Sequence, residues 1–409
     1  MRIPFTKYNL KGFSINRLPG QENELTSSQS FTGISVNTNT ALTYTAYWAC
    51  VRLLSETLAS LPLITYKRLS RGKERAIDHP LFKILHDEPN PETDSYTFLE
   101  TLMLHLVTEG NCYALIDWED ATKIKALWVM RPDRIQVHRD QQTKLVTYSY
   151  PNANGTPQTI PSYRVWHIPG LGYDGLTGYS PIRMAMQAIG LGLATEKFGS
   201  RLFGNGLNNG AILEHPAHMS DEAQKRFKKA MEDQHSGLDN AHKLMILEEG
   251  MKYQKTTIAP EEAQFLETRK FQRNEIATFF HVPPHMIGDL DRATFSNIEQ
   301  QSLEFAVYTM RPWLVRWEKS INRQLLLPQE KGTYFTEFLM DGLLRGDSTS
   351  RAAFYREMYY LGSLSPNEIR ERENMNPITD SNGDEYMTQA NMIALSQVGK
   401  QIPGKIPKL

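Results

Sequence analysis

Two histidines near the middle of the chain have the spacing of a metal-binding pair. On a helix, His281 and His285 would share one face and their ring nitrogens could bind the same ion. Pro283 and Pro284 lie between them, and proline removes a helical amide and disrupts the helix interior. The two imidazoles are therefore not expected to lie on one helical face, and no metal site is predicted there.

A short acidic stretch near the C-terminus resembles the start of a calcium-binding loop. It contains Asp380, Asn382 and Asp384. A calcium loop of this type needs glycine at its sixth position and glutamate at its twelfth. Glu385 and Asn391 occupy those positions, so a solvated turn is the better interpretation, and no cofactor is predicted for the chain.

The motifs that would bind nucleotides or provide a nucleophile are incomplete. The chain contains no G-x-x-x-x-G-K-[ST] phosphate loop, so it does not carry the ATP site of a translocating motor. Gly170, Gly172 and Gly175 lack the spacing of a dinucleotide-binding fingerprint. Residues 178–180 lack the second glycine of a nucleophile elbow. No catalytic residue is predicted, and the chain is not expected to be an enzyme.

One dense basic cluster and the overall charge bear on nucleic-acid binding. The cluster is either a solvated helix face or a docking site for a protein or nucleic acid, and it contains Lys225, Arg226, Lys228 and Lys229. The formal net charge of the chain is -1, whereas proteins that grip nucleic acid through its phosphates normally carry a basic excess. The charge argues against tight DNA binding, but it permits a protein past which DNA slides.

Composition indicates a large folded chain without membrane or secretion signals. A chain of 409 residues with 40% hydrophobic residues can bury a sizeable core and form about two or three domains. Cys50 and Cys112, the only cysteines, lie in apolar runs and are expected to be free core thiols. No run approaches the about 20 apolar residues that span a bilayer, and residues 1–20 do not resemble a signal peptide. A cytoplasmic location, or a particle assembled in the cytoplasm, is expected.

Apolar spacing indicates which elements position these residues in the first half of the chain. Residues 1–40 are rich in Asn, Ser, Thr and Gly and are expected to form a poorly ordered arm. Helices are predicted over residues 47–61 and 96–107, where apolar residues recur every three or four positions. Short β-branched and aromatic runs separated by turn formers predict a mostly antiparallel sheet, at residues 113–118, 126–130, 135–138, 145–150 and 165–168.

A long helix rich in small residues is predicted next. Ser180 should cap it, Pro181 should occupy its first position, and it should extend to about residue 204. Glycine costs about 1 kcal/mol relative to alanine inside a helix. Close approach of a neighbouring helix would offset this cost, although simple tolerance is the alternative; the small residues concerned include Ala188, Gly192 and Gly199.

An insertion and a further helix follow. Residues 206–260 are expected to hold a strand at 211–214, a basic helix over 220–229 and a hairpin over 243–255. A helix is predicted over 261–280, and its end is marked by the two prolines that follow.

The C-terminal part is predicted to be mainly helical. Residues 283–294 should form a long loop, followed by a capping box at Ser296 and Glu299 that begins a very long helix. Pro312 should kink that helix. A strand is expected over 334–338, and helices from residue 347 onward, one of them with a capping box at Ser365 and Glu368.

Several stretches of the chain form a combination of motifs that is specific together rather than singly. They are HVPPHMIG (281–288), RATFSNIEQ (292–300), TMRPWLVRW (309–317), DGLLRGD (341–347), GSLSPNEIRE (362–371) and, upstream, residues 47–62, 110–114 and 178–183. Together they cover nearly all of the chain after residue 40. In these motifs the chain resembles the portal proteins of tailed phages, of the kind found in long non-contractile-tailed phages.

The resemblance implies an α+β, helix-rich portal fold in which about twelve identical subunits form a ring around a tunnel. It implies no cofactor and no catalytic or metal site. The implied segments are a flexible N-terminal arm (1–40), an α/β wing (41–178), a first stem helix (179–206), a small α/β clip (207–260), a second stem helix (261–281), a tunnel loop (282–297), a long kinked helix with a wing strand (298–345) and a helical crown (346–409).

The resemblance also implies roles for residues on these segments. Stem helices would pack through Ala188, Gly192 and Gly199. The clip would dock its partners through Lys225, Arg226, Lys228 and Lys229. The tunnel loop would face DNA with near-balanced charge, so that it contacts DNA without holding it, through His285, Asp289, Asp291, Arg292 and Thr294.

A portal protein would form the DNA channel at one capsid vertex for genome packaging, head–tail joining and DNA ejection. Its implied protein partners are other copies of the chain, the terminase large subunit, a head-completion adaptor, and the major capsid and scaffolding proteins. Double-stranded DNA would pass through the channel without sequence specificity. It would lie in the virion after assembly in the bacterial cytoplasm, with no membrane contact. The alternatives are a head scaffold or adaptor without a tunnel, and a DNA-processing enzyme.

Overall fold

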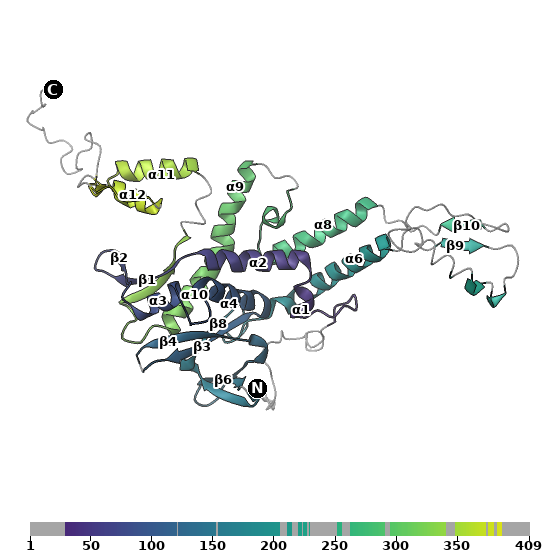
Figure 1. Cartoon of the computed structure of the whole chain (residues 1–409), viewed down its shortest axis with the longest axis horizontal. Helices are drawn as coiled ribbons and strands as arrows, with labels where there is room; N and C mark the ends of the chain where they lie inside the picture. Colours follow the sequence, from purple (N-terminus) through teal and green to yellow (C-terminus); the bar gives the residue numbers. More distant parts are fainter. Residues whose placement is uncertain are drawn as a thin grey trace, which may run out of the picture. The chain divides into compact units, whose positions relative to one another are not determined.

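The computed structural model divides the chain into two compact units, residues 1–340 and 341–409 (Figure 1). The structure describes residues 29–204 except 121 and 153, residues 211–214, most of 220–229, residues 252–255, 262–290 and 295–340, and residues 348–386 except 374 and 380–382. Within these described residues, no helix is both long and apolar enough to cross a membrane.

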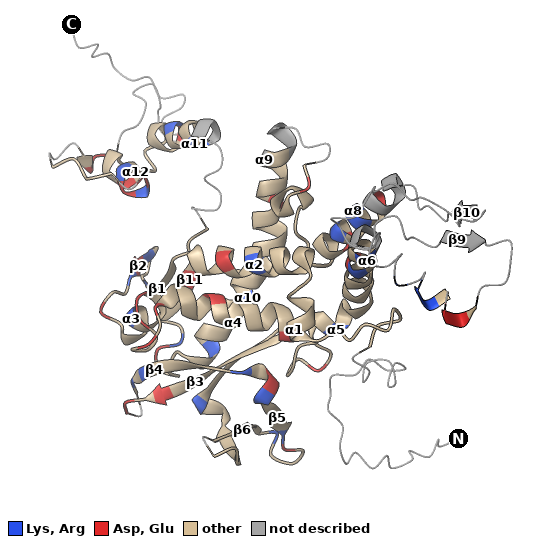
Figure 2. Ribbon diagram, turned by 45° about the vertical axis from the view of Figure 1, so that its right-hand side comes forward, with Lys and Arg blue, Asp and Glu red and all other residues tan. Residues whose placement is uncertain are grey.

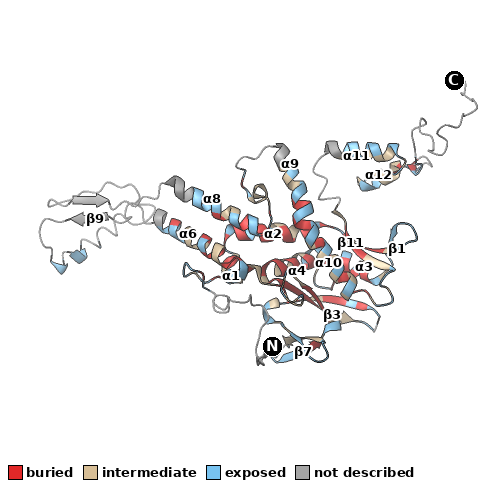
Figure 3. Cartoon of the chain, turned by 180° about the vertical axis from the view of Figure 1, so that it is seen from behind, coloured by how far each residue is buried: buried red, intermediate tan, exposed pale blue. Residues whose placement is uncertain are grey.

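Two helices form the helical part of the core in the first unit. They are α2 (Thr45–Ser60) and α4 (Ser95–Glu109), and their buried residues face each other and the neighbouring sheet (Figure 3). Helix α2 ends just before Pro62, which cannot continue a helix. Helix α4 ends at Gly110, whose φ of 75° is left-handed and suits glycine. Both predicted helices are confirmed.

Two antiparallel sheets occupy residues 111–169. In one, β3 (Asn111–Trp118) lies between β4 (Ile124–Met130) and β8 (Val165–Pro169). In the other, β6 (Val146–Pro151) lies between β5 (Gln136–Arg139) and β7 (Pro157–Pro161). The five predicted runs are all strands, whereas β7 was not predicted because prolines stand at both of its ends. Cys50 and Cys112 are buried free thiols, as expected.

A third sheet joins residues that are far apart in the chain. Its central strand β1 (Leu63–Arg68) pairs with β2 (Lys73–Arg75) and with β11 (Tyr334–Phe338). The strand at β11 was predicted, but β1, β2 and the short helix α3 (Pro80–His86) were not. Their apolar runs are too short to distinguish a strand from a buried helix by periodicity.

Residues 29–41 are structured, so the predicted disordered arm is wrong for this stretch. Asn37 caps the short helix α1 (Thr38–Ala41) with a complete capping box. The backbone N–H of Phe31 donates to Gln187, and the Thr32 hydroxyl donates to the carbonyl of Gly190. Polar side chains thus tie an apparently featureless segment to the helix that follows residue 180. Residues 1–28 lie outside the described part of the chain.

The long helix predicted after Ser180 consists of α5 (Pro181–Met184) and α6 (Met186–Gly204). Pro181 occupies the first turn, as predicted. The expected cap by the Ser180 hydroxyl is wrong, because this hydroxyl donates instead to the carbonyl of Thr108. The predicted helix over residues 261–280 is confirmed as α8 (Glu262–Phe279).

The insertion between these helices contains β9 (Ala211–Glu214) and β10 (Lys252–Lys255), which pair antiparallel. The strand at residues 211–214 was predicted. A hairpin was predicted over residues 243–255. Its second half, residues 252–255, is β10 and pairs with β9, while residues 243–251 lie outside the described residues. Described positions between 221 and 229 are helical, as predicted.

The last long helix is interrupted by a π-helical segment. Helix α9 (Phe295–Glu304) leads into η5 (Phe305–Met310) and then into α10 (Arg311–Gln324). The wider turn stands directly before Pro312, which has no amide to donate and whose ring crowds the carbonyl of the preceding turn. The sequence predicted a kink at Pro312, and the structure has a π-helical segment directly before this residue. Phe295 is already helical, so the predicted cap at Ser296 is wrong.

The second unit contains α11 (Ser348–Tyr360) and α12 (Pro366–Arg372). The capping box predicted at Ser365 and Glu368 is confirmed, with both reciprocal hydrogen bonds present. The Asn367 side chain bonds the backbone of Ile378 and the carboxylate of Asp384. Asp384 thus acts in a structural turn, while Asp380 and Asn382 lie outside the described residues.

Candidate functional site: the helix pair and the loop after α8

Helices α6 and α8 run side by side (Figure 1). The buried amide of Gln272 on α8 donates to the Thr195 hydroxyl on α6 over 2.9 Å. Arg269 of α8 forms an ion pair with Glu196 of α6 over 3.2 Å. Because polar pairs fix the two helices at a defined register, the two predicted stem helices are neighbours within one chain.

The small residues on α6 have different surroundings. A Cβ atom at Gly192 would lie 2.5 Å from Cζ of Tyr44, a rigid ring that cannot yield cheaply. Burial, and to a smaller extent the negative charge of the nearby Glu196, raises the pKa of Tyr44 to about 12, so the phenol stays neutral. Gly192 is therefore required by packing against Tyr44 inside the chain, and its predicted packing against the stem helix of a neighbouring subunit stays a prediction. Gly199 is buried and Ala188 is partly buried.

Helix α8 ends in a strained turn that begins the loop. His281 has a φ of 56°, a left-handed conformation that is uncommon for a residue with a side chain. The N–H of Val282 donates to the carbonyl of Ala277, closing a Schellman-type cap. The Thr309 hydroxyl in η5 donates to the carbonyl of His281. The π-helical segment η5 thus stabilises the turn at His281, where the chain leaves α8.

The loop continues as the single turn η4 (Pro284–Ile287) and reaches Gly288, whose φ of 88° is left-handed. Nδ1 of His285 lies 2.7 Å from Oε1 of Gln301 on α9. The two prolines separate His281 from His285, as predicted. Within the described residues, no group of three or more His, Cys, Asp or Glu side chains could hold a metal ion.

Asp289 turns inward instead of facing outward. Its carboxylate is only 7% exposed and lies 2.5 Å from the guanidinium of Arg273 on α8. The prediction that Asp289 faces DNA is therefore wrong for this structure, because an ion pair with α8 occupies the group. The adjacent Leu290 is 66% exposed, which no sequence signal indicated. Asp291, Arg292 and Thr294 lie outside the described residues.

The basic cluster of the insertion is exposed where it is described. Lys225, Arg226 and Lys229 are exposed and helical, and Lys228 lies outside the described residues. Exposure is expected both for a solvated helix face and for a docking site. The two interpretations of the cluster therefore remain open.

A polar network connects the start of β3 with the loop over residues 170–178. The amide of Asn111 donates to the carbonyl of Gly178 and its oxygen accepts from the N–H of Gly178. A Cβ atom at Gly178 would lie 2.1 Å from the carbonyl oxygen of Gly110, and one at Gly170 would lie 2.9 Å from it. Gly170 thus serves backbone packing, as expected for a turn glycine.

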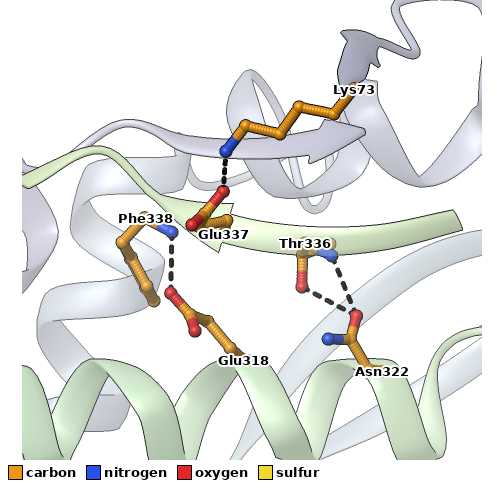
Figure 4. A network of polar contacts seen from close by, with 6 residues as sticks. All are labelled: Lys73, Glu318, Asn322, Thr336, Glu337 and Phe338. Atoms are coloured by element: carbon orange, nitrogen blue, oxygen red, sulfur yellow. Dashed lines mark hydrogen bonds and ion pairs between the residues drawn. The ribbon is translucent and has the colours of Figure 1, made fainter. Parts of the chain in front are cut away.

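Side chains on successive turns of α10 form hydrogen bonds with strands of two different sheets. Gln324 exchanges hydrogen bonds with both backbone groups of His167 on β8. On β11, Glu318 accepts the N–H of Phe338 and Asn322 accepts both the N–H and the hydroxyl of Thr336 (Figure 4). Burial raises the pKa of Glu318. Among the residues that the structure describes, β8 and β11 each pair with a strand on one side only, and side chains of α10 bond backbone groups of both strands.

Comparison with known proteins agrees with this arrangement. A sequence model of the family described as "Phage portal protein" matches residues 45–374. The "Probable portal protein" of Streptomyces phage phiC31 is 36% identical over 90% of this chain and 82% of its own length. The "Portal protein" of Enterobacteria phage HK97 is 33% identical over 89% of this chain and 86% of its own length.

Solved structures share the fold at lower identity. An HK97-family phage portal protein from Corynebacterium diphtheriae aligns with a TM-score of 0.58 and 15% identity, covering 76% of this chain and 98% of that one. The neck of a native gene transfer agent particle, determined with C12 symmetry, aligns with a TM-score of 0.57 and 22% identity, covering 88% and 95%. Given the family match and two relatives above 30% identity that align along most of both chains, this chain belongs to the phage portal protein family.

Proposed function

We propose that this portal protein forms a ring of about twelve subunits around a channel for double-stranded DNA at one vertex of a phage capsid. The ring would serve genome packaging, head–tail joining and DNA ejection, with no enzymatic activity. The observation that carries the proposal is the match to portal proteins along most of both chains. The α6–α8 pair, the insertion between them and the proline-broken loop supply the elements that such a ring needs.

The loop after α8 is the proposed DNA-facing segment. Leu290 is exposed beside the anchored Asp289, so the proposed DNA-facing part of the loop begins at Leu290. The proposed contacts are His285, Asp291, Arg292 and Thr294. The opposite charges of Asp291 and Arg292 would let DNA pass without being held, because phosphate neutralisation by several cations would slow it.

The insertion between α6 and α8 is the proposed docking site for the packaging terminase and later for a head-completion adaptor. Its exposed cations would meet acidic partner surfaces. Other proposed partners are the major capsid and scaffolding proteins. The proposed location is the virion, after assembly in the cytoplasm of the host bacterium, and the related neck structure with C12 symmetry supports a ring of about twelve subunits.

Imaging of the purified protein tests the ring. Light scattering after gel filtration should give an assembly of about twelve chains, and negative-stain images should show an axial hole. An assembly without a hole would favour a head scaffold or adaptor. A monomer with nuclease or ATPase activity would favour the enzyme alternative and contradict the proposal.

Packaging assays test the loop and the insertion separately. Replacing Arg292 by Glu in the loop should reduce the amount of DNA packaged, while Lys319→Glu on the exposed side of α10 should not. Charge reversal at Lys225, Arg226, Lys228 and Lys229 should weaken terminase or adaptor binding in a pull-down assay. Unchanged packaging or unchanged binding would count against the respective assignment.

A further inference from the structure

A concave surface of the first unit has a composition unlike that of its surroundings. It is a cavity of about 1070 Å³ formed where β5, β6 and β8 meet the C-terminal end of α10. Five segments that are distant in the chain contribute to it: residues 118–120, the turn over residues 140–145, the turn η2 (Ser162–Arg164), the loop over 170–178 and residues 323–331. We call it the basic groove.

The basic side chains of the groove outnumber its acidic ones by five to one. Asp120 is the acidic residue, and its carboxylate already accepts hydrogen bonds from Thr122 and Lys123 in its own turn. Within the part of the chain that the structure describes, none of the five basic side chains forms an ion pair with a carboxylate. The five are Arg139, Lys144, Arg164, Arg323 and Lys331. In a chain with a formal net charge of -1, this local excess attracts an anionic partner.

Apolar side chains line the same groove. Leu145 is 64% exposed and offers apolar surface to a partner. Leu176, Leu327, Pro328 and the exposed Tyr163 also line it. The groove thus combines basic side chains with apolar contact surface.

The groove is held in shape before any partner arrives. The Asp140 carboxylate caps the turn over residues 140–145 by accepting the N–H groups of Gln142 and Thr143. This turn places Lys144 at a left-handed φ of 59°. Across the groove, the Lys331 ammonium donates to the carbonyl of Arg323 at the end of α10 over 2.7 Å. Binding therefore requires little ordering of the backbone, which preserves affinity.

We propose that the basic groove binds an acidic peptide segment of another protein, with an apolar side chain of that segment seated against Leu145 and Leu327. Charge complementarity selects an acidic segment, and the exposed leucines select an apolar anchor. Duplex DNA fits less well, because a stiff double helix is too wide for a cavity of about 1070 Å³ and its phosphates gain nothing from contact with leucine. The site is separate from the proposed DNA channel and does not depend on it.

Fluorescence anisotropy with defined probes tests this site on the full-length protein. The main probe is a labelled peptide of about twelve residues, rich in Asp and Glu with a central Leu-Phe pair. In a second peptide the Leu-Phe pair is replaced by Ser-Ser, and in a third every acidic residue is replaced by Lys. The fourth probe is a DNA duplex that carries the same fluorescent label. The first peptide should bind, and each altered peptide should bind at least about tenfold more weakly, since both charge and anchor contribute.

Variants connect the binding to the groove. The exposed pair Arg139→Glu and Lys144→Glu should weaken binding of the first peptide by about tenfold or more. Leu145→Ser should weaken it by removing the apolar contact. The control pair Lys83→Glu and Lys125→Glu makes the same charge change at exposed positions outside the groove and should leave binding unchanged.

Three results would overturn the proposal. The first is that the acidic peptide does not bind, and the second is that it binds the groove variants and the control variant equally. The third is that the DNA duplex binds more tightly than the peptide and loses this binding in the Arg139 and Lys144 variant, which would assign the groove to nucleic acid. A failure of ring formation would not affect any of these measurements, so the two proposals are tested separately.

Discussion

At the scale of single residues, His167 shows how burial sets the chemistry of a group. Its ring lies between the Tyr148 hydroxyl and the Asn111 side chain, each at 3.2 Å. Burial lowers the pKa of His167 to about 3, so the imidazole is neutral at physiological pH. Asn111 in turn holds Gly178, and the ring therefore supports the connection between the β3 sheet and helix α5.

This burial predicts an acid-dependent loss of stability. Between about pH 6.5 and pH 3 the unfolded chain binds a proton at His167 that the folded chain does not, so the free energy of unfolding decreases as the pH falls. From pH 7 to pH 5 the loss should be about 2 kcal/mol for this group. Burial also lowers the pKa of His105, to about 4, and adds a change in the same direction.

Urea unfolding at pH 7 and pH 5 measures this effect. A His167→Gln variant retains hydrogen-bonding capacity but does not titrate, so its loss of stability between the two pH values should be smaller by about 2 kcal/mol. An equal pH dependence of the variant and the unaltered protein would show that His167 is not the responsible group.

At the scale of elements, α10 connects the sheet that contains β8 with the sheet that contains β11. Its side chains satisfy the backbone at the open edges of β8 and β11, and Trp317 packs edge-on against Trp166 of β8 with ring centroids 5.6 Å apart. Lys73 of β2 adds an ion pair to Glu337 on β11 (Figure 4). Basic and acidic positions are interspersed along the described helices and strands (Figure 2).

Asn322 provides a measurable contribution to this contact. Asn322→Ala should lower the free energy of unfolding by about 1–2 kcal/mol, because the N–H and the hydroxyl of the buried Thr336 lose their acceptor. Chemical denaturation measures the change. Lys319→Ala, one turn away and exposed, should change stability by less than about 0.5 kcal/mol. Equal effects of the two variants would contradict the assigned role.

The elements themselves were largely predictable from local patterns. Helices α2, α4, α6 and α8 follow from apolar periodicity and from proline and glycine at their ends. Strand β1 was not predicted, because its apolar run is too short to distinguish a strand from a buried helix; its pairing with β11 at residues 334–338 makes it a strand. Pairing between segments that distant depends on the assembled core, which a local window of sequence does not contain.

At the scale of the whole molecule, the chain divides after Met340 into two compact units. The first unit contains both β1 and its partner β11, and the stacked rings of Tyr66 and Phe335 lie within it at 5.7 Å. The sheet formed by β2, β1 and β11 is thus built entirely from residues of the first unit.

Truncation tests this independence. A chain ending at Met340 should retain a cooperative thermal unfolding transition, measured by circular dichroism, because no strand of the first unit is removed. A chain ending at Gln324 lacks β11 and should lose the transition or unfold at a much lower temperature. If the chain ending at Met340 fails to unfold cooperatively, the first unit does not fold by itself.

The sequence alone specifies the types of element, the free buried thiols and the resemblance to portal proteins, because these depend on residue identities close together in the chain. Only the tertiary structure places Asp289 against Arg273, Gly192 against Tyr44, and five cations around one groove. Each of these arrangements joins side chains from separate segments, and their burial and pairing energies exist only once the segments have packed together.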